Sequence, residues 1–343
     1  MITISPKESY DEIVKNISVG LTPMLVSSPG LGKSAVHRQV AKDHRLKLID
    51  LRLSQCTPED LNGFPMREGN KAVFTPFDIF PLEGDSLPFD EDGNELEGWL
   101  LFLDEISSAS KQVQAAAYKL ILDREVGSFK LHTNVAISSA GNLATDKAVT
   151  VAMSTALQSR LIHYEMQSNT EQWIDWAFKE GIDHRIISFI SYMPTRLMDF
   201  RPDHQDKTFP CPRTWEFLSR LIKDEPVSHK ILARVAGTIG AGVATEFITF
   251  CKEFDRLPKI DDIIFDPVTV SLPPEVSTKY ATMSMLVEHF NEKTVKPILT
   301  YIGRFDIEMR ILFMRGAVST DPDLPMKNEA FAAEMKTLAR YLQ

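Results

Sequence analysis

The sequence contains a glycine-rich segment of the kind that binds the phosphates of a nucleotide. Residues 27–34 read SSPGLGKS and stand between an apolar run of strand length and a helical pattern, which argues against a chance turn. The glycines let backbone N–H groups turn toward a polyphosphate, and the helix start adds positive potential. Lys33 could reach the β- and γ-phosphates, and the Ser34 hydroxyl could bind Mg²⁺. Such loops usually begin with glycine, whereas this one begins with Ser27.

A pair of carboxylates follows a second apolar run. Residues 100–105 read LLFLDE. Asp104 is expected at the carboxyl edge of a sheet, where it could hold the water shell of Mg²⁺. Glu105 is expected on the γ-phosphate side, where it could orient and deprotonate an attacking water. The pair favours hydrolysis, because a kinase would exclude that water; for these two residues alone, an acid pair in a plain turn is the alternative.

Apolar runs of strand length alternate with helical patterns through the first half of the chain. The runs are rich in Leu, Ile, Val and Phe, as strands covered on both faces should be. They cover residues 23–28, 46–53, 99–104, 134–140 and 161–166, and the helical patterns cover 34–44 and 110–124. This alternation predicts an α/β fold in which a parallel five-stranded sheet lies between two layers of helices.

From about residue 170 onward the patterns are helical only. They cover 170–180, 183–193, 213–223, 228–236 and 241–254 and, after a proline-containing connection at 257–274, also 275–291, 294–305, 307–317 and 328–342. We expect three parts. These are an αβα nucleotide-binding domain at 1–167, an all-helical lid at 168–256 and a C-terminal helical extension at 257–343.

The composition is that of a globular protein from a reducing compartment. Of the 343 residues, 43% are hydrophobic and 25% are charged, and the net charge is −9. Cys56, Cys211 and Cys251 are far apart, and the histidines show no metal-ligand spacing, which argues against disulfides and a zinc site. The histidines are expected as surface or packing residues. Without a signal-peptide pattern or a membrane-spanning run, we expect a cytoplasmic protein with no membrane partner.

One segment carries much of the negative charge. Residues 72–110 contain no Lys or Arg, and acidic residues cluster between Asp78 and Glu97. We favour a solvated surface loop, and a docking surface for a basic partner is the alternative. The overall acidity weighs mildly against nucleic-acid binding but is compatible with a local basic lining.

Several of these segments resemble the AAA+ ATPases, and more closely their MoxR-like branch. They are the phosphate loop, the LLFLDE run with EISSAS after it, and the helical pattern KQVQAAAYKLILDREVG. The resemblance implies bound ATP and Mg²⁺, with Ser34 and Asp104 as metal ligands. The residues implied around ATP are Ser28, Pro29, Gly30, Leu31, Gly32, Lys33, Ser34, Ala35 and Arg213.

The resemblance also assigns roles to three polar residues. Asn142, which ends NVAISSAGN, matches a residue that positions the lytic water, so it joins Glu105 as catalytic. Arg160, in TALQSRL, matches an arginine finger that acts on the neighbouring subunit's nucleotide. Arg213, in CPRTWEF, matches a second sensor that contacts the γ-phosphate of its own subunit. Singly, Asn142 could be a turn former and the arginines surface charges, but their order along the chain favours the joint interpretation.

An insertion separates the second and third strand patterns and extends over about residues 57–98. Residues 57–81 predict a helix, a hairpin with its turn at 68–70, and a short helix. They resemble the helix-2 insertion of the clade that contains MoxR, which implies contact with substrate or gating of a pore. A purely structural hairpin is the alternative.

The resemblance implies a Mg²⁺-dependent, ATP-hydrolysing ring, most simply a homohexamer, that acts as a chaperone-like remodelling motor. It further implies a partner protein with a von Willebrand factor A-type domain. An AAA+ nucleic-acid motor or loader is the alternative, disfavoured by the net charge and by the lack of a helix-turn-helix pattern with a basic recognition helix. A nucleotide-gated scaffold is a third interpretation, against which Glu105 and Arg160 argue.

Overall fold

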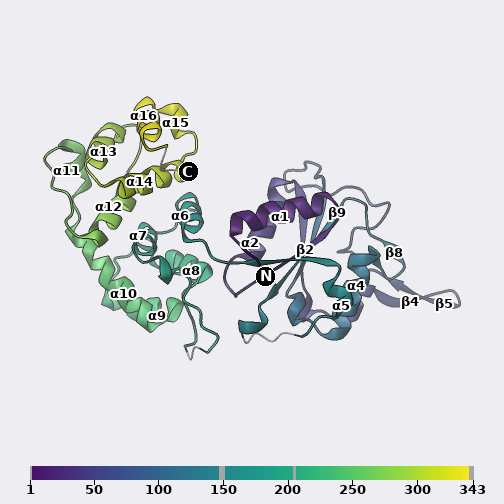
Figure 1. The fold of residues 1–343 in the computed structure, drawn as a ribbon. Coiled ribbons are helices and arrows are strands. Elements are labelled where there is room, and N and C mark those ends of the chain that lie inside the picture. Colours follow the sequence, from purple (N-terminus) through teal and green to yellow (C-terminus); the bar gives the residue numbers. More distant parts are fainter. Residues whose placement is uncertain (1, 147–150, 204–205, 340–343) are drawn as a thin grey trace. The chain divides into compact units, whose positions relative to one another are not determined.

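The computed structural model describes residues 2–146, 151–203 and 206–339. It divides into two compact units, Met1–Gln167 and Ser168–Gln343 (Figure 1). The first unit is a sheet with helices, and the described part of the second is helical. Among the described residues, no helix is both long and apolar enough to cross a membrane.

The first unit is built on one sheet of six parallel strands. Their order across the sheet is β1-β10-β2-β9-β6-β3. In that order the strands are Thr3–Ile4, Leu161–Met166, Thr22–Ser27, Val135–Asn142, Gly98–Asp104 and Leu46–Arg52. The α/β fold class was predicted, but the predicted count of five strands was wrong. The sixth strand, β1, has only two residues, too few for a periodic pattern to reveal it.

Helices cover both faces of this sheet, as the side chains of β6 illustrate. All seven residues of β6 are buried, which accounts for its continuous apolar sequence. Leu100 belongs to a core with α1 (Pro6–Ser18) and α2 (Lys33–Asp43). Leu101 belongs to the core with α4 (Lys111–Leu122). Because successive side chains of a strand point to opposite faces, these two cores are the two sides of a three-layer αβα unit.

The insertion between β3 and β6 forms the predicted hairpin but not the helix expected after it. Its elements are η1 Leu53–Gln55, α3 Pro58–Asn62, β4 Phe64–Glu68 and β5 Lys71–Thr75. Strands β4 and β5 pair in antiparallel fashion. Residues 76–97, all of which are described, contain no helix. Pro76 and Pro81 leave four residues between them, and the residue before a proline is biased away from helix.

Short elements complete the first unit. They are η2 Ile106–Ser108, β7 Glu125–Val126, β8 Phe129–Lys130, η3 Ala144–Asp146 and α5 Thr155–Gln158. The turn η2 follows directly on β6 and Glu105, and α5 precedes Arg160. These two elements therefore lie next to Glu105 and Arg160, for which the sequence predicts catalytic roles.

The second unit has a single helical core. Its helices are α6 Thr170–Lys179, α7 His184–Tyr192, α8 Pro212–Ile222, α9 Leu232–Ile239, α10 Ala241–Cys251, α11 Ile260–Phe265, α12 Val276–Glu288, α13 Val295–Ile302, α14 Ile307–Thr320, α15 Leu324–Lys327 and α16 Glu329–Leu338, with short turns η4 Pro194–Arg196, η5 His229–Ile231 and η6 Lys252–Arg256. One cluster of buried apolar side chains extends from Trp173 to Leu338. The connection expected at 257–274 contains the short helix α11. The division into a lid at 168–256 and an extension at 257–343 stays a prediction.

Candidate nucleotide-binding site

The glycine-rich segment forms a loop between the end of β2 and the start of α2. Gly30 and Gly32 have φ of +84° and +94°, in the left-handed region that glycine enters without strain. Gly32 precedes α2, which has no side-chain cap and no acidic residue in its first turn. The first N–H groups of a helix have no partner within the helix. An uncapped helix start behind a glycine loop therefore fits a phosphate.

Lys33 and Asn142 meet where β2 and β9 end. The Lys33 ammonium donates to the side-chain oxygen of Asn142 at 3.1 Å. It also donates to the carbonyl and hydroxyl oxygens of Ser27, at 3.0 and 3.1 Å. Ser27 pairs with Asn142 in the parallel ladder, so the two strand ends lie side by side. The fold thus joins two residues of the predicted site that are 109 positions apart.

Ser34 and Asp104 form a pair of oxygen ligands suited to Mg²⁺. The Ser34 hydroxyl donates to one carboxylate oxygen of Asp104 at 3.0 Å, and the backbone N–H of Glu105 donates to the other at 2.8 Å. Mg²⁺ is usually held by one or two carboxylates together with substrate phosphates and water. Within the described ranges, no three His, Cys, Asp or Glu side chains gather around a possible metal position. Phosphates and water would therefore complete the ligand shell.

Carboxylates crowd this edge of the sheet. Burial, followed by the neighbouring Asp104 carboxylate, raises the pKa of Asp50 on β3, and Glu105 acts in the same direction. The guanidinium groups of Arg52 and Arg38 oppose this rise. Mutual repulsion among carboxylates is relieved by a bound cation, so the electrostatics also fit Mg²⁺.

Glu105 has a backbone conformation that turns the chain away from β6. Its φ of +57° is left-handed, which costs about 1–3 kcal/mol for a residue other than glycine. Its carboxylate accepts a hydrogen bond from the hydroxyl of Ser54, which follows β3. Arg52 pairs with Asp104 in the ladder between β3 and β6, so both strands bring the residues after them to one edge. Ser54 was not predicted, because local patterns do not reveal which strands are neighbours.

Ser107 joins the turn after Glu105 to the end of β9. Its hydroxyl oxygen accepts a hydrogen bond from the backbone N–H of Asn142 at 2.9 Å. A Cβ added at Gly141 would lie 2.7 Å from that hydroxyl oxygen and 2.7 Å from the terminal methyl of Met24. Glycine therefore permits the close approach of β9 to η2. Ser107, which was not predicted, sets the position of Asn142.

His37 packs the phosphate-loop helix against the sheet. Its Nδ1 lies 2.8 Å from the carbonyl oxygen of Lys33, and its Nε2 lies 2.7 Å from the Ser138 hydroxyl. A carbonyl can only accept, so Nδ1 carries the proton and Nε2 accepts from Ser138. The ring stacks on Phe102, with centroids 4.0 Å apart. Burial lowers the pKa of His37 to about 4, which keeps the ring neutral.

Comparison with known proteins identifies no close relative. Neither a protein-family model nor a curated protein matches the chain. Among solved structures, the chain is similar to NtrX from Brucella abortus in complex with ATP, with 14% identity, coverage of 98% of this chain and 69% of that chain, and a TM-score of 0.40. It is also similar to a mutant of RuvB from Thermotoga maritima, with 14% identity, coverage of 97% and 83%, and a TM-score of 0.36.

Arg160 is exposed between α5 and β10. One of its guanidinium nitrogens donates to the Ser159 hydroxyl at 2.9 Å, and its guanidinium carbon lies 5.8 Å from the centre of the Tyr118 ring. Neither of these contacts is with a residue of the candidate phosphate or Mg²⁺ site, such as Lys33 or Asp104. A residue that acts on the nucleotide of a neighbouring subunit should be exposed in a single chain, but this role of Arg160 stays a prediction.

Arg213 belongs to the second unit, where it lies in the first turn of α8. Its role at the nucleotide also stays a prediction.

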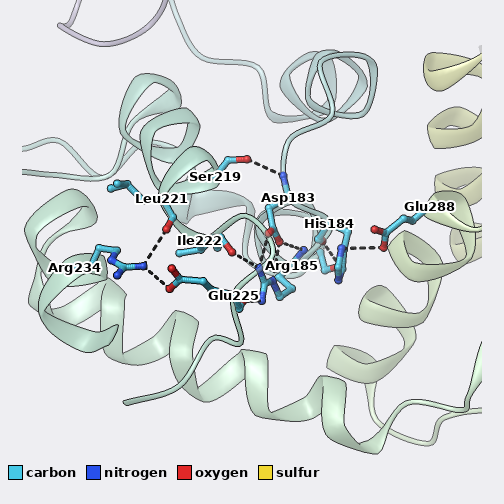
Figure 2. A network of polar contacts seen from close by, with 10 residues as sticks. Asp183, His184, Arg185, Ser219, Leu221, Ile222, Glu225, Arg234 and Glu288 are labelled. Atoms are coloured by element: carbon cyan, nitrogen blue, oxygen red, sulfur yellow. Dashed lines mark hydrogen bonds and ion pairs between the residues drawn. The ribbon is translucent and has the colours of Figure 1, made fainter. Parts of the chain in front are cut away.

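Two other arginines bind carbonyl groups at the C-terminal end of α8 (Figure 2). Arg185 donates to the carbonyl of Ile222 at 2.9 Å, and Arg234 donates to the carbonyl of Leu221 at 3.1 Å. Cations suit the last carbonyls of a helix, which lack partners and carry the negative end of its dipole.

Proposed function

We propose that this chain is an AAA+ ATPase that hydrolyses Mg²⁺-bound ATP. The observation that carries the proposal is the convergence of five side chains at the carboxyl ends of three adjacent strands. They are Lys33 and Ser34 after β2, Asp104 and Glu105 at the end of β6, and Asn142 at the end of β9. Each belongs to a residue type that phosphoryl chemistry uses, and none requires a second chain to reach this edge.

In this proposal the glycine loop, Lys33, Ser34 and Asp104 bind the phosphates of ATP and its Mg²⁺. The N–H groups of the loop and of the first turn of α2 bind phosphate oxygens, and the Lys33 ammonium neutralises negative charge on them. Ser34 and Asp104 hold Mg²⁺, which when bound offsets charge on the β- and γ-phosphates. The left-handed φ of both loop glycines supports this assignment, because it allows backbone and phosphate to approach closely.

Glu105 is the proposed general base and Asn142 the proposed water-positioning residue. In the structure, the carboxylate of Glu105 accepts a hydrogen bond from the Ser54 hydroxyl. The Ser54 hydroxyl occupies a carboxylate oxygen that could otherwise accept from an attacking water. Glu105 therefore acts as base after it exchanges the Ser54 hydroxyl for water.

Two variants test the ATPase proposal directly. Glu105→Gln should bind ATP with affinity close to that of the unmodified chain and release no phosphate, whereas Lys33→Ala should lose ATP binding. Calorimetric titration with ATP and a phosphate-release assay separate these effects. Sustained turnover by Glu105→Gln would reject the general base, and absence of ATP binding by the unmodified chain would reject the function.

We further propose that the ATPase assembles as a ring, most simply a hexamer, and that this ring remodels a partner protein. The expected class of partner is a von Willebrand factor A-type protein.

The surface around the hairpin supports contact with another protein. Phe64, Met66 and Phe74 are 56%, 55% and 48% exposed there. Phe64, Phe74 and Phe77 also line an open hollow beside α3. Grouped exposed apolar side chains are typical of protein-contact surfaces.

The remodelling proposal is tested by trapping the ATP-bound state. Light scattering of Glu105→Gln should show a ring in the presence of ATP. Immobilised Glu105→Gln should retain its client only with ATP, and Phe64→Ser/Phe74→Ser should release the client while keeping the ring. Salt-sensitive DNA binding with DNA-stimulated turnover would instead favour the nucleic-acid motor.

A further inference from the structure

One buried amide connects the turn after the acid pair to the segment that leads to Arg160. The Gln114 side chain, on α4, is 4% exposed. Its Nε2 lies 3.2 Å and 3.3 Å from the carbonyl oxygens of Ile106 and Ala109, in the turn that follows Glu105. The same nitrogen lies 3.2 Å from the carbonyl oxygen of Val151. The two N–H groups of this amide thus serve three carbonyl acceptors from two segments.

A second link joins the same two segments. The backbone N–H of Val151 donates to the carbonyl of Ser107 at 2.7 Å. The Ser107 hydroxyl in turn accepts from the backbone of Asn142. The turn after Glu105, the end of β9 and the segment that begins at Val151 are therefore joined by one connected set of hydrogen bonds.

The same face of α4 also contacts Arg160 itself. Tyr118 lies four residues after Gln114, so both side chains are on one side of the helix. The Tyr118 ring is partly buried beneath the Arg160 guanidinium, whose carbon is 5.8 Å from the ring centre. This distance allows attraction between the cation and the ring.

We propose that Gln114 and Tyr118 are positioning residues that link the turn after Glu105 to Arg160. The inference rests on the proposed function, in which Arg160 acts on the nucleotide of the neighbouring subunit. Gln114 holds both segments to α4, and Tyr118 sets the direction of the guanidinium. A shift of the turn as Glu105 leaves Ser54 is transmitted to Arg160, so the state of one nucleotide site alters the next site in the ring.

Tyr118 is tested by substitution and by subunit mixing. Tyr118→Leu should lower kcat about 2–5-fold, the effect expected of one exposed cation–ring contact, with little change in the KM for ATP. Tyr118→Phe keeps the ring and should keep kcat. Lys33→Ala subunits bind no ATP yet present an intact Arg160, so adding them to Tyr118→Leu subunits should restore turnover. Tyr118→Met, which also lacks the ring, serves if Tyr118→Leu does not fold.

The mixing result separates this inference from the function on which it rests. Arg160→Ala mixed with Lys33→Ala is the reference, and its rescue establishes that Arg160 acts across subunits. If that pair recovers while Tyr118→Leu does not, the role of Tyr118 is rejected. If the reference pair itself fails to recover, the trans role of Arg160 is rejected, and the link to a neighbouring site is rejected with it.

Gln114 makes a different prediction because it contacts both segments. Gln114→Leu mixed with Lys33→Ala should recover only in part, since the intact subunits supply Arg160 but cannot restore the turn beside Glu105. Full recovery of turnover would mean that Gln114 acts only through Arg160. No recovery would mean that it acts only through the turn beside Glu105. Either result would overturn its proposed two-sided role.

Discussion

The Lys33 ammonium donates to the side-chain oxygen of Asn142 across the ends of two adjacent parallel strands, at 3.1 Å. One residue starts the phosphate-loop helix and the other ends the strand beside that loop. An arriving phosphate must share or replace this bond, so Asn142 is placed to respond to whether the site is filled.

Charge at position 142 should therefore control ATP affinity. Asn142→Asp puts a carboxylate beside Lys33 that competes with phosphate, and it should weaken ATP binding roughly tenfold or more, the scale of a hydrogen bond to a charged group. Asn142→Ala, which adds no charge, should bind ATP much better than Asn142→Asp while also losing turnover. Calorimetric titration measures both affinities. Equal affinities would show that the contact with Lys33 has no bearing on phosphate binding.

Ser54 should restrain Glu105. Removing its hydroxyl in Ser54→Ala frees a Glu105 carboxylate oxygen to accept from the attacking water, so basal turnover should rise by about 2–10-fold, the scale of one hydrogen bond. Ser54→Thr keeps the hydroxyl and is the matched control. Phosphate release at saturating ATP is the measurement, and Ser54→Ala/Glu105→Gln should be inactive. A fall in the rate of Ser54→Ala would mean that Ser54 orients Glu105 productively.

Gly141 should tolerate no side chain. In Gly141→Ala the new methyl meets the Ser107 hydroxyl and the Met24 methyl at 2.7 Å, and overpacking of this kind costs about 1–3 kcal/mol. Gly237→Ala is the control, because a Cβ there meets no atom within 4 Å and alanine suits a helix better than glycine. Urea unfolding should show a lower midpoint for the first variant and an unchanged or higher one for the control. Unimpaired stability of Gly141→Ala would contradict the close approach of β9 to η2.

His37 should make the first unit sensitive to acid. Its pKa is about 4 in the folded protein because of burial, whereas an unfolded chain has a histidine pKa near 6.5. The unfolded state therefore binds the proton first as the pH falls below 6.5, and folding stability declines down to pH 4, by about 3 kcal/mol in total. Hydrogen exchange of peptides from β6 and β9, measured between pH 7 and pH 4.5, should show protection that falls with the pH.

The control for His37 is a residue that does not titrate. Gln can donate to the Lys33 carbonyl and accept from Ser138, so His37→Gln should lose the part of the pH dependence that His37 causes. An identical loss of protection in both proteins would assign the acid sensitivity to other groups.

The predicted fold class depends on signals that local sequence carries well. Apolar runs alternating with helical patterns predicted a covered parallel sheet, because strands buried on both faces need continuous apolar sequence. The β1 strand escaped prediction because two residues have no period, and the helix expected after the hairpin does not form between Pro76 and Pro81. Both differences arise where a segment is too short for a pattern to decide.

Local sequence patterns identify the chemical groups of the site: a glycine loop with Lys33 and Ser34, an acid pair at Asp104 and Glu105, and Asn142 at a strand end. These are recognisable because each stands at the end of an apolar strand pattern. The partners of these groups, such as Ser54 for Glu105, are fixed by the folded arrangement of the strands. The reason is physical: these hydrogen bonds depend on which parallel strands lie next to each other, and strand order arises from packing of the whole sheet, not from local periodicity.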